Sequence, residues 1–131
     1  MKAYTDLGQS KKLVELGIDV NTADMMWDDW SLIDEGWKLS VGYYPEIEKD
    51  YGRKCYPAWS LAVLLDQLDD IICDEDGNEY ELVIKKEGVQ YDLYYLTVYG
   101  EQENIELDRF YDDLIDCCYE MILKLKEKGL I

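Results

Sequence analysis

Residues 80–95 read YELVIKKEGVQYDLYY and contain two runs in which side chains of different character alternate. Alternation with a period of two predicts half-buried strands, because successive side chains of a strand point to opposite faces. Glu87-Gly88 lies between the runs and has the chemistry of a turn. We therefore predict an antiparallel hairpin with strands at 80–85 and 89–95, of which the second could extend to Tyr99.

An earlier segment predicts a second hairpin. Residues 37–44 read WKLSVGYY, and the apolar positions again recur every second residue. Met25–Trp30 is the predicted strand before this run. Asp34-Glu35-Gly36 provides turn residues between the two strands. The segment from Glu46 to Lys54 is charged, and we expect it to be a loop.

Two helices are predicted before the second hairpin. The first spans 6–16, because Asp6 and Gln9 have the spacing of a capping box and Gly17 follows as a stop signal. The next helix begins at Pro57, since proline suits the first position of a helix. Leucines at i, i+3, i+4 and i+7 then form one apolar face, at Leu61, Leu64, Leu65 and Leu68.

The last helix is predicted from Asp108, its N-cap, to Gly129, its stop signal. Acids in its first turn and lysines in its last turn suit the helix dipole. Its apolar stripe consists of Phe110, Leu114, Cys118, Met121 and Leu125. The whole chain is thus predicted to be a single α+β domain over residues 1–131, in the order α-β-β-α-β-β-α, with antiparallel hairpins packed against helices. One core is expected to contain Leu61, Leu65, Leu114, Met121 and Leu125.

The charge of the chain restricts its partners. Thirty acidic residues against thirteen basic ones give a formal net charge of −17. Such a chain repels nucleic-acid phosphates and anionic membranes, so we expect no direct nucleic-acid or membrane binding. A basic protein partner fits this charge, as does plain solubility of the chain.

The cysteines and the N-terminal segment predict a cytoplasmic protein. The first residues lack the apolar stretch of a signal peptide. In the cytoplasm the four cysteines, Cys55, Cys73, Cys117 and Cys118, are expected to stay reduced. They form no C-x-x-C pair, and we interpret them as small buried apolar residues. Trp59 is interpreted as a packing anchor.

Catalytic and cofactor motifs are absent from the sequence. The chain contains no histidine, which removes the Ser-His-Asp and Cys-His arrangements and all histidine metal ligands. Neither glycine-rich phosphate-binding motif is present. The segment around Gly77 fails as a calcium loop, because the first and twelfth positions fall on Ile72 and Val83. We therefore predict no metal and no cofactor, and only carboxylates remain as candidate catalytic groups.

One stretch could form an interaction surface. From residue 66 to residue 79 the chain carries seven acids and no base: Asp66, Asp69, Asp70, Asp74, Glu75, Asp76 and Glu79. Asp76-Gly77 predicts a tight turn within it. The stretch is either an ordinary solvated face or a patch that presents carboxylates where a basic protein expects phosphates.

Three segments, 9–25, 57–65 and 116–130, in this order resemble a family of short uncharacterised proteins from gut Bacteroidales genomes and their phages or mobile elements. They include QSKKL at 9–13 and PAWSL at 57–61. The family commonly has a small residue where this chain has Cys117, and its central strands vary. The resemblance covers about half the chain. It implies a mobile-element setting and no catalytic residue.

These observations favour a non-enzymatic domain that binds another macromolecule, as an accessory protein of a phage or mobile element. The alternative is an acidic nucleic-acid mimic that inhibits a DNA- or RNA-binding host protein. A further alternative is an enzyme that uses carboxylates alone. Two carboxylates with raised pKa values in one cleft would indicate the enzyme.

Overall fold

Helices and antiparallel strands alternate along the chain, as predicted for the α+β class. The structure is a computed structural model that describes residues 2–31, 36–100 and 102–131. The chain divides into two compact units, Ala3–Val63 and Leu64–Ile131 with Met1–Lys2. We call them the N-terminal and C-terminal units and describe each by itself. The single-domain organisation stays a prediction.

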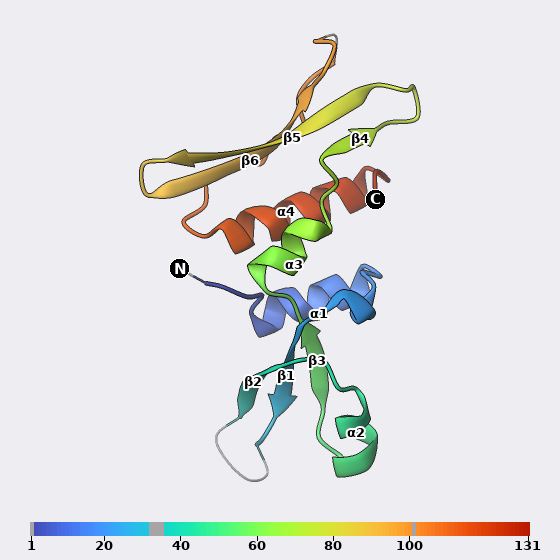
Figure 1. Cartoon of the computed structure of the whole chain (residues 1–131), viewed down its shortest axis with the longest axis vertical. Coiled ribbons are helices and arrows are strands. Elements are labelled where there is room, and N and C mark those ends of the chain that lie inside the picture. The colour runs from blue at the N-terminus through green and yellow to red at the C-terminus, as the bar shows by residue number, and fades with distance from the viewer. Residues whose placement is uncertain (1, 32–35, 101) are drawn as a thin grey trace. The chain divides into compact units, whose positions relative to one another are not determined.

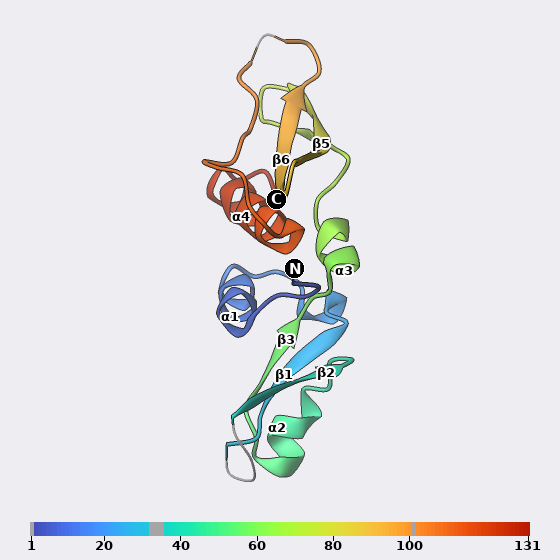
Figure 2. The ribbon, with the colours of Figure 1, turned by 90° about the vertical axis from the view of Figure 1, so that its left-hand side faces the viewer.

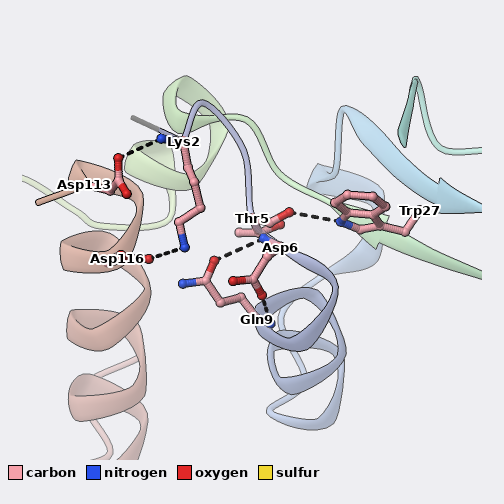
Figure 3. Close-up of polar contacts among 7 residues, drawn as sticks. All are labelled: Lys2, Thr5, Asp6, Gln9, Trp27, Asp113 and Asp116. Carbon is pink, nitrogen blue, oxygen red and sulfur yellow. Dashed lines mark hydrogen bonds and ion pairs between the residues drawn. The ribbon is translucent and has the colours of Figure 1, made fainter. Parts of the chain in front are cut away.

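The first helix of the N-terminal unit, α1, spans Leu7–Glu15, and its predicted capping box is confirmed. The backbone N–H of Gln9 donates to Asp6 Oδ1 at 2.8 Å, and the N–H of Asp6 donates to Gln9 Oε1 at 3.1 Å (Figure 3). Gly17 has a φ of +82°, a conformation that ends helices and favours glycine. A short 3₁₀ turn, η1 (Val20–Thr22), follows.

The sheet of this unit contains β1 (Met25–Asp29), β2 (Trp37–Val41) and β3 (Cys55–Ala58) in the order β2-β1-β3. The antiparallel pairing of β1 with β2 confirms the predicted first hairpin. Asp34 and Glu35 of its predicted turn lie outside the described residues.

Pro57 was predicted to begin a helix, and this prediction is wrong. Pro57 lies in β3, paired with Met26 of β1, and α3 (Leu61–Asp66) begins four residues later. Since β3 is at the edge of its sheet, the missing N–H of a proline is tolerated there. The leucine pattern predicted the helix correctly but overestimated its length, and Leu68 is buried beyond its end.

The predicted loop at Glu46–Lys54 is also wrong, because the structure has a helix, α2 (Glu46–Tyr51). Glu46 and Glu48 lie in its first turn, where negative charge favours the helix dipole. Gly52 ends the helix in the left-handed conformation, with a φ of +67°. The charged residues that suggested a loop therefore form a helix with no buried residue.

Trp59 is fully buried in the N-terminal unit, which confirms its predicted role as a packing anchor. Its indole N–H donates to Thr22 Oγ1 at 2.9 Å. Its backbone N–H donates to Thr5 Oγ1 at 3.1 Å, and Thr5 Oγ1 also pairs with Ser10 Oγ at 2.8 Å. The carbonyl of Thr5 accepts the indole N–H of Trp27 at 3.0 Å (Figure 3).

The C-terminal unit contains a second antiparallel sheet, formed by β4 (Ile71–Cys73), β5 (Glu79–Glu87) and β6 (Gln90–Thr97) in that order. The β5–β6 pairing confirms the predicted hairpin, and its turn contains Gly88 with a φ of +63°. One face of the sheet covers the helix α4 (Leu114–Glu127), as Figures 1 and 2 both show. The buried side chains of this face are Ile72, Tyr80, Leu93 and Tyr95.

Helix α4 begins at Leu114 and not at Asp108. The residues before it are held along β6, where Tyr111 bridges to Tyr91 and Ile105 bridges to Tyr95. This pairing keeps the chain extended and delays the start of the helix. The predicted C-terminal end is confirmed, with Lys124 and Lys126 in the last turn and Gly129 following in the left-handed region.

The shift in the start of α4 changes which residues form the core. Phe110 is 46% exposed, and Leu114 is only partly buried. The fully buried residues of the helix are Ile115, Cys117, Cys118, Met121, Ile122 and Leu125. Of the predicted core, Met121 and Leu125 are thus confirmed, whereas Leu61, Leu65 and Leu114 are partly exposed.

Lys2 belongs to the C-terminal unit and is held at the first turn of α4. Its backbone N–H donates to Asp113 Oδ1 at 2.7 Å, and its Nζ lies 2.6 Å from Asp116 Oδ1 (Figure 3). The two carboxylates also suit the positive end of the helix dipole.

Candidate functional site

The structure places the seven acids of the predicted patch in two groups. Asp66 ends α3, and Asp69 and Asp70 follow in the connection to β4. Asp74–Asp76 form the turn between β4 and β5, and Glu79 begins β5. Strand β4 separates the groups by about 13 Å, from the rise of a strand over four residues.

The first group surrounds a hollow of about 380 Å³, which we call the acidic hollow. Its acids, Asp66, Asp69 and Asp70, are all exposed. Its apolar lining comes from two places in the chain. The lining residues are Leu65 and Leu68 next to the acids, and Leu82 and Ile84 on β5. The hollow therefore combines a negative rim with an apolar interior.

Backbone contacts fix the acidic rim to the sheet. The hydroxyl of Tyr95, on β6, donates to the carbonyl of Asp69 at 2.7 Å. The N–H of Leu82 donates to the carbonyl of Asp70 at 2.8 Å. Burial of Tyr95, together with the nearby charges of Asp69 and Asp70, raises the pKa of its hydroxyl. The hydroxyl therefore stays protonated as a donor, and the rim is held in place.

The second group is mainly structural. The carboxylate of Asp74 accepts from the N–H of Asn78 at 2.9 Å, from Asn78 Nδ2 at 3.0 Å and from the Tyr80 hydroxyl at 3.1 Å. These hydrogen bonds, those from Asn78 foremost, lower the pKa of Asp74. The predicted turn at Asp76-Gly77 is confirmed, since Gly77 has a φ of +80° and its N–H donates to the Asp74 carbonyl. Asp74 therefore holds the turn together, and within the turn Glu75 and Asp76 carry the exposed charge.

The charges of the rim are not neutralised locally. The ion pairs between described residues involve other acids, namely Asp116 with Lys2, Glu15 with Lys12, Asp28 with Arg53 and Asp108 with Lys124. In the described part of the chain, no ion pair reaches Asp66, Asp69 or Asp70. Three exposed carboxylates beside a low-dielectric apolar lining produce a concentrated negative potential. The described residues contain no group of three His, Cys, Asp or Glu side chains that could hold a metal ion.

Two carboxylates outside the predicted patch have raised pKa values. Burial is the main cause for both Asp92 and Glu120. Sequence reasoning missed them, because their burial depends on how residues 105–111 cross β6 and α4. Asp92 lines a hollow of about 540 Å³ and Glu120 lines another of about 320 Å³, and these hollows share only Leu107 and Asp108. The two groups therefore line different hollows instead of one cleft.

The N-terminal unit contains a further charged cluster that the sequence did not indicate. Asp28 is only 3% exposed and accepts from Arg53 Nε at 3.1 Å and Arg53 Nη2 at 3.0 Å. The guanidinium also lies 4.2 Å from the ring centre of Trp30 and 5.3 Å from that of Tyr51. Its hydrogen bonds to Asp28 raise the pKa of Arg53. Asp28 and Arg53 neutralise each other, so this cluster is not a candidate binding site for a charged ligand.

Comparisons with protein families, with curated proteins and with solved structures find no match to this chain. Among the described residues, no helix has both the length and the apolar character needed to span a bilayer.

Proposed function

We propose that this chain is a non-enzymatic binding domain and that a basic protein docks at its acidic hollow. One observation carries the proposal: three exposed carboxylates, which form no ion pair with any described residue, surround an apolar hollow whose rim is fixed to the sheet. Lysine or arginine side chains suit the rim, and an apolar side chain suits the interior. A site of this composition recognises a protein segment better than it recognises a small anion or a nucleic acid.

The setting is part of the same proposal. We place the protein in the cytoplasm, as an accessory protein of a phage or mobile element. The resemblance of three segments to proteins of gut Bacteroidales and their phages supports this setting. The four cysteines, whose thiols are unpaired in the structure, suit a reducing compartment.

A nucleic-acid mimic is the second candidate, favoured by the net charge of −17 and by the exposed Glu75 and Asp76 at the far end of β4. A mimic would present both acidic groups as one row of phosphate equivalents. Its target would then release it when DNA or RNA is added.

The test is affinity purification from a lysate of a gut Bacteroidales bacterium with matched charge variants. One variant carries Asp66→Asn, Asp69→Asn and Asp70→Asn. The control carries Glu103→Gln, Glu106→Gln and Glu127→Gln, three exposed acids outside the patch. Both variants change the net charge equally, so only the position of the lost charges differs.

Docking at the acidic hollow predicts that the partner binds the wild type and the control, and that binding weakens as salt rises. The hollow variant should lose the partner. Equal loss with both variants would show a non-specific charge effect and overturn the proposal. Release of the partner by added DNA or RNA would favour the mimic.

A further inference from the structure

The edge of β5 next to the acidic hollow is only partly covered. Strand β4 pairs with Glu79–Glu81, and one further hydrogen bond joins Leu82 to Asp70. Strand β5 continues to Glu87, and Figure 1 shows the β5–β6 hairpin extending well past β4. The chain leaves this edge at Asp70.

The backbone groups of Ile84 and Lys86 point to this edge. In an antiparallel strand, alternate residues bond to opposite neighbours. Val98 N–H donates to the Glu79 carbonyl, so the odd-numbered residues of β5 bond to β6. Leu82 N–H donates away from β6, and Ile84 and Lys86 follow it at intervals of two. Within the described residues, no strand pairs with these two positions.

The open edge and the acidic hollow are continuous. Leu82 and Ile84 line the hollow and belong to the same face of β5. A strand added beside Ile84 and Lys86 would continue the line of β4 beyond Asp70. Its residue opposite Ile84 would share the face of Ile84, because directly paired residues lie on one side of a sheet. That side chain would enter the hollow.

We propose that an extended segment of a basic protein pairs with β5 at Ile84–Lys86 by strand addition. This inference rests on the proposed function and specifies how the partner binds. Backbone hydrogen bonds to the edge provide affinity, and the hollow selects the side chains. An apolar residue faces Ile84, and lysine or arginine residues face Asp66, Asp69 and Asp70.

Charge selects a basic partner over a second copy of this chain. Two copies joined at this edge would bring two acidic hollows and two chains of charge −17 together. Lys85 and Lys86 lie at the far end of the edge and repel the bases of a bound segment there. The bound segment therefore carries its bases at the end near Asp70 and none at the end near Lys86.

Two variants of Lys86 distinguish the effect of backbone pairing at the edge from the effect of the lysine charge on binding. Lys86→Pro removes the N–H that faces the edge and leaves the bonds of β5 to β6 intact, since proline is tolerated on an open edge. Lys86→Gln removes the same positive charge and keeps the N–H. The probe is a fluorescent lysine–valine nonapeptide in which valine alternates with serine in one half and with lysine in the other, so that all its bases lie at one end. A second peptide has the same sequence with a methyl group on every backbone nitrogen and cannot donate hydrogen bonds from its backbone.

Strand addition predicts that Lys86→Pro binds the lysine–valine peptide about fivefold more weakly than the wild type, the effect of one net hydrogen bond. Lys86→Gln should bind it equally or more tightly, because a positive charge is lost. The methylated peptide should not bind the wild-type protein measurably. Circular dichroism and the unfolding midpoint check that Lys86→Pro is folded, and the methylated peptide tests the inference without any variant.

The results also separate this inference from the proposed function. Equal binding of both peptides, equal binding to Lys86→Pro and wild type, or no binding of the unmethylated peptide overturns strand addition. If a partner from the lysate is lost with the Asp66, Asp69 and Asp70 variant but binds Lys86→Pro normally, docking at the hollow stands and edge pairing fails. If the partner is lost with Lys86→Pro but still binds the Asp66, Asp69 and Asp70 variant, edge pairing is supported and docking at the acidic hollow is overturned.

Discussion

Thr5 links helix α1 to the backbone at Trp59 through one fully buried side chain. Its Oγ1 pairs with Ser10 Oγ and accepts the backbone N–H of Trp59, and its own N–H donates to the Trp59 carbonyl at 2.9 Å. Ser10 is also fully buried. Such polar groups are stable in a core only when they are hydrogen-bonded to one another.

Replacing Thr5 with valine tests this link. The two side chains have nearly the same shape, but Thr5→Val leaves the Trp59 N–H and the Ser10 hydroxyl buried without this partner. We expect the free energy of unfolding to fall by about 2 kcal/mol or more in urea denaturation. Thr5→Ser keeps the hydroxyl and should cost only about 1 kcal/mol, for one methyl group. Equal losses in the two variants would contradict a role for the hydroxyl.

The four cysteines are expected to react at different rates. Cys117 and Cys118 are fully buried, as interpreted from the sequence for all four cysteines, but this interpretation is wrong for Cys73, which is exposed. Burial raises the pKa of Cys117 to about 11 and that of Cys118 to about 12. Burial also raises the pKa of Cys55.

A disulfide-exchange reagent at pH 8 should therefore modify Cys73 first and Cys55 more slowly, because the thiolate is the reactive form. Cys117 and Cys118 should react only on unfolding. Denatured protein that has not been reduced should release four thiols. Recovery of two thiols under anaerobic conditions would mean that a disulfide exists.

Helix α4 shows why a shift of one residue along a helix matters. The predicted stripe included Leu114, but the neighbouring Ile115 is fully buried and Leu114 is not. The error arose because Asp108 and Phe110 resemble a helix start. In the structure these residues belong to the extended segment along β6.

Truncation of Ile122 and of Leu114 compares how much a fully buried and a partly buried side chain of α4 contribute to stability. Ile122→Ala should reduce the free energy of unfolding by about 2–5 kcal/mol, since it opens a cavity in the core. Leu114→Ala should cost less, because its side chain is already partly in water. Urea denaturation monitored by circular dichroism gives both values. A larger loss for Leu114→Ala would contradict the observed start of the helix.

Helices and strands with a local sequence pattern were predicted correctly. Short strands that form only by pairing with another strand of this chain were not predicted. The alternation in β5 and β6 and the capping box at Asp6 are local, and both were identified correctly. Strands β3 and β4 have four and three residues, and they exist through pairing with β1 and β5. Similarly, the sequence indicated the acids of the hollow. It did not indicate Leu82 and Ile84, because they line the hollow only once β5 has paired with β4.

The excess of negative charge acts against the folded chain as a whole. A net charge of −17 produces self-repulsion that salt or added protons reduce. The carboxyl groups with shifted pKa values then determine whether stability rises or falls with pH. The pKa values of Asp92 and Glu120 are raised, chiefly by burial, whereas hydrogen bonds lower the pKa values of Asp74 and Asp29.

We expect stability to rise as the pH falls from 7 towards the raised pKa values of Asp92 and Glu120. Groups with raised pKa values bind protons more tightly in the folded state, so their stabilising contribution is lost as the pH rises through the folded pKa. Asp74 and Asp29 act oppositely, and their contribution is lost as the pH falls below their ordinary value of 3.8. Unfolding midpoints between pH 3 and pH 8 should therefore show a maximum.

The variant Asp92→Asn with Glu120→Gln should flatten the fall in stability as the pH rises to 7, because it removes two carboxylates with raised pKa values. A midpoint that increases steadily up to pH 8 in the wild-type protein would contradict this assignment.

The bridges from Ile105 and Tyr111 to β6 limit the direction in which strands can be added to the C-terminal sheet. A fibril grows because each sheet exposes two opposite edges, so that every added strand provides the template for the next. In this sheet residues 105–111 occupy one edge, and the remaining edge lies beside β4 and β5. Recruitment of a strand is therefore confined to that edge, so a sheet built on this chain can extend in one direction and not in two.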